Sequence, residues 1–213
     1  MLFRSGTAEE LSAVPFEPAL RNQFIGDVND TISRFNQTAS NLSTTITLID
    51  GAASQEVVEL NSALSELADI NEKLRPTRPG TAQHTALLDQ RDAALTVITE
   101  KLDVDISFGA NGATDISRGG TSLVAFNSAT PISFVANAGG SFDLDVGGTI
   151  QSSPTNGTIG GLHRAQSDIA AVAANLDALA VQFAGEINGW QANGRTDAGA
   201  AGAALVDHSG TAA

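Results

Sequence analysis

Residues 87–107 read LLDQRDAALTVITEKLDVDIS, a stretch in which a helical pattern changes into a strand pattern. Steps of three and four first connect the positions Leu88, Arg91, Leu95, Ile98 and Leu102, all of which are apolar except the arginine. From Val104 apolar residues alternate with polar ones. The first spacing places apolar side chains on one face of a helix, and the second places them on one face of a strand. We therefore predict a helix that has Thr85 as its N-cap and runs to about Leu102, followed directly by a strand.

Upstream of this helix, the same three-and-four stepping extends over two longer segments. The first covers residues 25–49 and begins near Pro18, because the first turn of a helix tolerates proline. Asp50-Gly51 then interrupts the pattern as a turn or a local irregularity. The second segment covers residues 57–74 and ends at the sequence RPTRPG, since two prolines and a glycine cannot continue a helix. These segments are the predicted first and second helices, and the helix that follows them is the third.

Downstream of the stretch, short alternating runs indicate strands. Apolar residues occupy every second position in residues 104–108 and again in residues 142–146, and paired glycines separate such runs. Period-two apolar residues between glycine turns are typical of antiparallel strands. The three-and-four stepping then returns over residues 162–190 and predicts a fourth helix. From Asn193 onward the residues are small and glycine-rich, which favours a loop.

The predicted fold class is α+β, a long-helix bundle or rod domain with a small antiparallel β domain inserted between the third and fourth helices. The apolar faces of the four helices can pack against one another. The strands form an insertion between the third and fourth helices. The predicted helical domain is discontinuous and comprises residues 1–102 and 159–213, and the predicted β domain comprises residues 103–158.

The charged residues of the third helix lie where a packed face is expected. Arg91 shares a face with the leucines before and after it, Asp92 lies beside that face, and Asp89 is placed in the first turn, where a negative charge favours the helix dipole. A buried guanidinium must be paired, so we expect Arg91 to contact a carboxylate or amide on the second or fourth helix, most naturally Asn71. The residues interpreted as setting the register of the packed helices are Asn71, Leu88, Asp89, Arg91, Asp92 and Leu95.

Composition disfavours several classes of partner and excludes cysteine chemistry. The net charge is -13, and no basic patch is visible, so a nucleic-acid partner and an anionic membrane partner are disfavoured. No apolar stretch approaches the ~20 residues that span a bilayer. The chain contains no cysteine, which excludes disulfides and cysteine-ligated metal sites. Residues 1–13 lack the features of a cleaved secretory signal.

Residues able to carry chemistry are few and scattered. The histidines are His84, His163 and His208. Each lies outside any recognisable catalytic or metal-ligand spacing, so we interpret them as surface or helix-end residues. Two pairs of aspartates lie beside strand patterns, namely Asp103 with Asp105 and Asp143 with Asp145. Two acids are too few ligands for calcium, and we interpret these pairs as the solvent faces of half-buried strands. The sequence therefore predicts no catalytic residue, no cofactor and no metal site.

The stretch LLDQRDAALTVITEKLDVDIS resembles the central signature of the first hook-associated protein family of bacterial flagella, in which Leu-Asp-Gln-Arg-Asp lies on a helix that leads into a strand. Further segments resemble the family in the same order, namely ELSAVPFEPALRNQFIGDVNDTISRFNQTASNL, LNSALSELADINEKL and GGLHRAQSDIAAVAANLDALAVQFAGEINGWQANGRTDAGAAG. In the second of these, Asn61 and Asn71 match asparagines of the family pattern. The resemblance runs from about residue 10 to residue 207.

This resemblance implies a non-enzymatic structural protein of the bacterial flagellum at the junction between hook and filament. The protein would be exported through the flagellar type III apparatus and would lie outside the cell. Its implied partners are the flagellar hook protein, the third hook-associated protein or the filament, and further copies of itself in a ring. Members of the family carry terminal helices at both ends that this sequence lacks, so we expect a central fragment that is a soluble monomer by itself.

Other protein classes give similar patterns. Flagellin and the third hook-associated protein also combine long helices with β insertions, but lack the LLDQRD signature. A coiled-coil secreted or signalling protein would have long heptads without a reason to interrupt them by strands. A glycan hydrolase would require two acids that face a cleft, for which Asp105 and Asp143 are the candidates.

Overall fold

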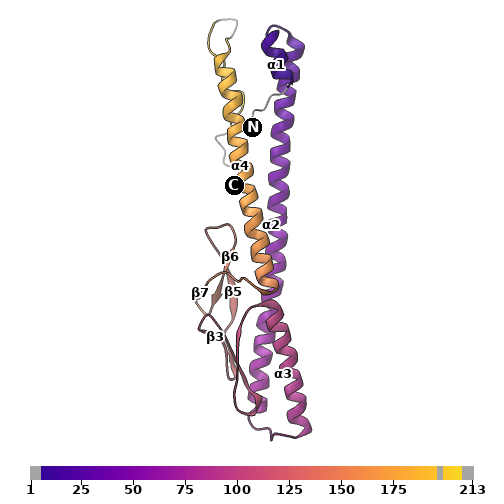
Figure 1. Cartoon of the computed structure of the whole chain (residues 1–213), viewed down its shortest axis with the longest axis vertical. Coiled ribbons are helices and arrows are strands. Elements are labelled where there is room, and N and C mark those ends of the chain that lie inside the picture. The colour runs from indigo at the N-terminus through magenta and orange to yellow at the C-terminus, as the bar shows by residue number, and fades with distance from the viewer. Residues whose placement is uncertain (1–5, 196–198, 208–213) are drawn as a thin grey trace. The chain divides into compact units, whose positions relative to one another are not determined.

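The computed structural model describes residues 6–195 and 199–207. Its helices are α1 (Gly6–Ala13), α2 (Pro18–Leu74), α3 (Ala82–Lys101) and α4 (Gly157–Asn193) (Figure 1). Between α3 and α4 lie the strands β1 (Asp105–Phe108), β2 (Thr114–Arg118), β3 (Thr121–Ala125), β4 (Ser128–Ala129), β5 (Ile132–Ala136), β6 (Phe142–Val146) and β7 (Thr149–Gln151). All paired strands are antiparallel, in the orders β1-β2-β3-β4 and β5-β6-β7. The predicted α+β class, with antiparallel strands inserted between α3 and α4, is confirmed.

The chain divides into two compact units. The first unit comprises residues 1–45 and 171–213, and the second unit comprises residues 46–170. The strands belong to the second unit together with α3 and with parts of α2 and α4. This division follows packing, whereas the division predicted from the sequence follows the type of secondary structure and stays a prediction.

Helix α2 is continuous where the sequence predicted an interruption. Residues 50 and 51 both lie within it, so the predicted break at Asp50-Gly51 is wrong. A glycine inside a helix lowers helix stability by only about 1 kcal/mol relative to alanine. The hydrogen bonds and packing of the surrounding helical residues outweigh this loss. The carboxylate of Asp50 also accepts a hydrogen bond of 2.8 Å from Gln166 on α4, and its carbonyl accepts one of 2.8 Å from Ser54. Asp50 therefore packs as a helical residue and does not form a turn.

The helix starts are only partly as predicted. Pro18 is the first residue of α2, in agreement with the prediction. Helix α3 has Thr81 as its N-cap, and the Thr81 hydroxyl accepts the N–H of His84 at 3.2 Å. The prediction of Thr85 as N-cap is therefore wrong, because the chain enters the helix directly after Gly80, whose φ of +81° ends the preceding turn. The sequence did not predict α1, which is too short to show a periodic pattern.

The second unit has one main core, to which helices and strands both contribute. Buried residues from α2, α3, α4 and the strands form a single cluster that includes Leu60, Leu64, Ile98, Leu123, Leu144 and Ile159, each fully or almost fully buried. Figure 1 shows α3 and the strands beside the same part of α2. Because the strands share this core with the helices, removing the helices would expose the apolar residues of the strands to water.

The two alternating runs differ in burial. Phe142, Leu144 and Val146 of β6 are buried, as the alternation predicted. In the other run, Val104 packs against the main core, but Ile106 and Phe108 of β1 are 37% and 62% exposed, so the expected apolar face is covered only at its start. Strand β1 pairs with β2 alone and lies at the edge of its sheet, where fewer neighbours cover its side chains.

The first unit packs α1, the start of α2 and the end of α4 around a smaller core. Its buried residues are Leu11, Phe24, Val28, Phe183, Ala184 and Val206. Phe35 and Phe183 contact each other with ring centroids 5.8 Å apart. Two residues of the predicted apolar face of α4, Val172 and Leu179, are exposed. No helix among the described residues is both long and apolar enough to cross a membrane.

Candidate functional site

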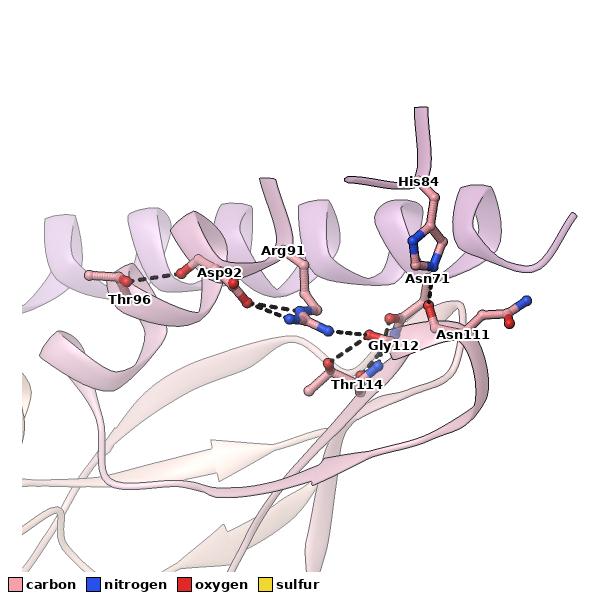
Figure 2. Close-up of polar contacts among 8 residues, drawn as sticks. All are labelled: Asn71, His84, Arg91, Asp92, Thr96, Asn111, Gly112 and Thr114. Atoms are coloured by element: carbon pink, nitrogen blue, oxygen red, sulfur yellow. Dashed lines mark hydrogen bonds and ion pairs between the residues drawn. The ribbon is translucent and has the colours of Figure 1, made fainter. Parts of the chain in front are cut away.

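The helical residues singled out by the sequence meet the chain between β1 and β2. Residues 108–114, which we call the β1–β2 connection, lie against α2 and α3 (Figure 2). Asn71 reaches this connection from α2, and His84 and Arg91 reach it from α3. All of these residues belong to the second unit.

Asn71 is fully buried and pairs with the backbone of the connection as a strand would. Its Nδ2 donates to the carbonyl of Thr114 at 2.8 Å, and its Oδ1 accepts the N–H of Thr114 at 2.8 Å. The same Nδ2 donates to the carbonyl of Phe126 at 2.6 Å. One amide therefore satisfies three backbone groups, two at the start of β2 and one in the turn after β3. Each of these groups would destabilise the fold if it were buried without a partner.

Arg91 contacts the same connection from α3. Its Nη1 donates to the carbonyl of Gly112 at 2.8 Å, and Nε and Nη2 donate to one carboxylate oxygen of Asp92 at 2.9 and 2.7 Å. Its guanidinium carbon lies 5.2 Å from the centroid of the Phe108 ring, a cation–π geometry. The Arg91 side chain is only 13% exposed, and its charge is paired with that of Asp92, whose side chain is 62% exposed at the edge of the site.

The predicted pairing of Arg91 with Asn71 is wrong. Both residues hold the β1–β2 connection, but each through its own backbone partners (Figure 2). The prediction failed because it considered only contacts between helices, whereas a strand-forming segment occupies the space beside α2 and α3. The carboxylate partner of Arg91 is its neighbour Asp92 on the same helix.

The other predicted register residues have different surroundings. Leu95 is buried in the main core, and Leu88 is half-buried against a small cluster of Ile70, Leu74 and Leu87. Asp89 is exposed and makes no hydrogen bond or ion pair among the described residues. Since α3 begins at Ala82, Asp89 is not in its first turn, and the predicted interaction with the helix dipole there is wrong.

The residues of the connection itself were not among those predicted from the sequence. Asn111 and Gly112 both have positive φ, +56° and +80°, and so form a tight left-handed turn. A Cβ at Gly112 would lie 2.5 Å from Leu88 Cδ2 and 2.8 Å from Arg91 Nη1. The Asn-Gly dipeptide is a signal for such a turn and was available in the sequence. Its contact with α3 was not, because it joins residues far apart in the chain.

His84 supports the same turn. Its Nε2 lies 3.1 Å from the carbonyl oxygen of Asn111, a hydrogen bond that the Nε2–H tautomer donates. His84 is in the first turn of α3, as a helix-end residue should be, but it is buried and not on the surface. His163 is half-buried and packs against Phe142, with the two ring centroids 5.4 Å apart and the rings nearly perpendicular. It is therefore neither a surface residue nor a helix-end residue. His208 lies outside the described residues.

Two further asparagines repeat the pairing of Asn71. Asn61 on α2 donates to the carbonyl of Ile132 and accepts its N–H, both at 2.8 Å. In the first unit, Asn188 on α4 donates to the carbonyl of Val206 at 2.7 Å and accepts the N–H groups of Leu205 and Val206 at 2.8 and 2.9 Å. Each of these amides fastens the backbone of a strand or loop to a long helix. We call them the amide clamps.

The hydrogen bond from Arg91 to Gly112 gives a testable expectation. Replacing Arg91 by leucine should lower the free energy of unfolding by about 2 kcal/mol, because a part-buried carbonyl loses its donor and Phe108 loses its cation. The matched control is Arg75→Leu, which removes an ion pair with Glu72 in which the arginine is 66% exposed. Such a pair contributes at most about 1 kcal/mol. Urea unfolding followed by circular dichroism measures both, and equal effects would mean that the contact with Gly112 stabilises nothing.

A second charged contact joins the end of α3 to α2. Lys101 Nζ lies 2.6 Å from Glu56 and 2.7 Å from Glu59, and the lysine side chain is only 10% exposed. Burial alone lowers the pKa of Lys101, but the hydrogen bonds and charges of both glutamates outweigh it, so the pKa is raised. The hydrogen bond from Lys101, followed by one from Gln55 and the charge of Lys101, lowers the pKa of Glu59.

These shifts predict how stability depends on pH. A lowered pKa for Glu59 means that its contribution is present above its ordinary pKa of 4.5 and is lost as the pH falls through the lowered value. A raised pKa for Lys101 means that its contribution is present below its ordinary pKa of 10.5 and is lost as the pH rises through the raised value. In Glu59→Gln, the loss of stability under acid should therefore be smaller than in the parent chain. Urea midpoints measured across the acid range test this, and an unchanged pH dependence would contradict it.

The aspartates named in the sequence analysis hold loops. Asp143 accepts a hydrogen bond of 2.6 Å from Ser153, and Asp145 accepts the N–H of Gly148 at 2.7 Å. Asp103 lies 3.4 Å from Arg118, while Asp105 is exposed. In the described part of the chain, no group of three or more histidine, cysteine, aspartate or glutamate side chains is placed to hold a metal ion. The geometry of the site therefore supports structural roles for its polar residues.

Comparisons with known proteins agree with this architecture. A model of the helical domain of the flagellar hook-associated protein FlgK matches residues 5–206. No curated protein sequence matches the chain. Among solved structures, the flagellar hook junction protein FlgK from Burkholderia pseudomallei is similar with a TM-score of 0.78 and 24% sequence identity, over 93% of this chain and 38% of that one. At this identity the likeness shows the fold, and the chain spans well under half of that protein's length. Because the family model covers nearly all of the sequence, the chain belongs to the family of the FlgK helical domain.

Proposed function

We propose that this chain is a structural component of the bacterial flagellum and forms part of the junction between hook and filament. The observation that carries the proposal is the match to the helical domain of flagellar hook-associated protein FlgK over residues 5–206. The similar solved structure is described as a flagellar hook junction protein, which supports the same role. The buried polar residues of the site fasten strands and loops to helices, which is a structural role.

The proposal includes the partners and location of such a component. They are the flagellar hook protein on one side, the third hook-associated protein or the filament on the other, and further copies of the protein in a ring. The protein would reach the outside of the cell through the flagellar export apparatus. The negative net charge of -13 supports protein partners over nucleic acid or an anionic membrane.

Within this component, the LLDQRD segment would set the register between α3 and the strands. Leu88, Leu95 and Arg91 with Asp92 pack α3 against its surroundings, and Asn71 completes the attachment from α2. The role inferred from the sequence was to set the register between helices. The proposed role differs, because these residues would set the register between the helices and the β1–β2 connection. Asp89 is exposed and makes no hydrogen bond or ion pair among the described residues, so its proposed contribution would be through its charge.

Deleting the gene that encodes this chain tests the proposed function. Cells should then assemble hooks without attached filaments, release filament protein into the medium and stop swimming. Restoring the gene on a plasmid should restore attached filaments, which controls for effects on neighbouring genes. Deletion cells that keep attached filaments and swim normally would refute the proposal.

A further inference from the structure

A cavity in the first unit has an unusual combination of linings. It has a volume of about 600 Å³ and lies among α1, the start of α2, the end of α4 and the chain that follows α4. Its apolar lining residues are Leu11, Pro15, Phe24, Ile25, Trp190 and Leu205. The ring centroids of Phe24 and Trp190 are 4.9 Å apart. The groove is open to solvent, since Trp190 is 38% exposed and Ile25 is 42% exposed. We call this cavity the Trp190 groove.

The charged lining of the groove is entirely basic. Arg21 and Arg195 line it, and its lining residues include no aspartate or glutamate. The chain as a whole has 24 acidic and 11 basic residues, so this surface departs from the overall charge. In the described ranges, neither arginine forms an ion pair, and each donates instead to a backbone carbonyl: Arg21 Nε to Pro15 at 2.7 Å and Arg195 Nη1 to Gly199 at 3.3 Å.

These hydrogen bonds matter for binding because they hold the guanidinium groups in place. Each arginine uses one N–H group on the backbone and keeps further donors that can face a ligand. A side chain that is already ordered loses less conformational entropy when a ligand binds. Two positioned arginines beside an exposed tryptophan are the residue types that contribute most to protein–protein binding sites.

We propose that the Trp190 groove binds an acidic amphipathic segment of a partner protein. The apolar side chains of that segment would cover Trp190 and Ile25, and its carboxylates would pair with Arg21 and Arg195. Charge complementarity argues for this occupant, since the groove offers two unpaired cations and no competing carboxylate. A second copy of this chain is the alternative occupant, and the experiment below distinguishes it by its dependence on protein concentration.

This inference goes beyond the proposed junction role and is tested in solution, so a negative result would leave that role untouched. Trp190 is the only tryptophan and the chain has no tyrosine, so fluorescence emission reports directly on the groove. The probes are two synthetic amphipathic peptides free of tryptophan and tyrosine. Both carry leucine and phenylalanine on one helical face, and one carries glutamate and the other lysine on the opposite face.

The expected result is a saturable blue shift of the Trp190 emission with the glutamate peptide and not with the lysine peptide. Arg21→Glu and Arg195→Glu should each weaken binding about tenfold, because an attractive charge pair becomes repulsive. The matched control is Arg34→Glu, which changes net charge equally in the same unit but lies outside the groove lining. Binding to Arg34→Glu should match the parent, and circular dichroism should show the same helical content in all variants.

Three results would overturn the proposal. The first is equal or tighter binding of the lysine peptide, and the second is no emission shift with either peptide. The third is a blue shift that appears when the protein alone is concentrated and disappears in both Arg21→Glu and Arg195→Glu, which would identify the occupant as a second copy. If Arg21→Glu loses helical content, Arg195→Glu decides the outcome by itself, since its hydrogen bond to Gly199 is exposed.

Discussion

Asn71→Leu should lower the free energy of unfolding by about 4 kcal/mol, a large part of the roughly 5–15 kcal/mol that stabilises a typical protein. The substitution leaves the N–H and carbonyl of Thr114 and the carbonyl of Phe126 without their amide partner. Asn71 and Thr114 are both fully buried, so water cannot replace these hydrogen bonds without opening the structure. Urea unfolding followed by far-ultraviolet circular dichroism measures the change.

The control for this expectation is Gln90→Leu, which replaces an exposed amide of α3 by the same residue. Its free energy of unfolding should stay within about 0.5 kcal/mol of the parent. If Asn71→Leu were equally mild, the clamp would contribute nothing to stability. A third variant, Asn71→Asp, retains the acceptor for Thr114 N–H but faces two carbonyls with a carboxylate, and should also be strongly destabilised.

Gly112→Ala should lower the free energy of unfolding by about 3 kcal/mol. The left-handed φ of +80° costs a residue with a side chain about 1–2 kcal/mol. The new methyl group would also meet Leu88 Cδ2 at 2.5 Å and Arg91 Nη1 at 2.8 Å, so the connection or α3 must move. The same urea titration measures the loss.

Gly120→Ala separates the two causes. Gly120 has the same φ of +80°, but nothing lies within 4 Å of the position that its Cβ would take. Gly120→Ala should therefore show only the cost of the left-handed backbone, the same about 1–2 kcal/mol. The difference between the two variants measures how tightly the β1–β2 connection is packed on α3. Equal losses would contradict the close contact of Gly112 with Leu88 and Arg91.

The helices were predictable because their signal is local and repeated. Three-and-four stepping identified α3 and α4 and, as two separate segments, α2, and alternation identified β6. The exceptions are also local in origin. Gly51 does not interrupt α2, because the cost of one glycine in a long helix is small. Thr81, not Thr85, caps α3, and the residue type alone does not distinguish the two threonines.

The contacts of Arg91 and Asn71 were not predictable in the same way. The sequence showed that a buried guanidinium and a buried amide need partners, and both have them. It could not show which partners, because Thr114 and Asn71 are 43 residues apart and the backbone groups of Gly112 and Thr114 have no signature of their own. Only the fold decides which carbonyl lies opposite a given side chain.

The amide clamps and Arg91 suggest a common design for this fold. Asn61, Asn71 and Asn188 each attach a strand or a loop to a long helix. The amide pairs with backbone groups of that strand or loop, and so it acts independently of the side chains there. A structural component built in this way holds its strands in register through the helices. That feature is consistent with a chain whose proposed role is mechanical.

The most direct test of the proposed junction role is the position of the protein on the flagellum. Antibodies raised against this chain would be applied to intact flagella and detected with gold particles in the electron microscope, with the gene-deletion strain as the control for specificity. The proposed function predicts gold at the boundary between hook and filament and nowhere else along the flagellum. Gold distributed along the filament, or absent from the boundary while the protein is present in the cells, would contradict it.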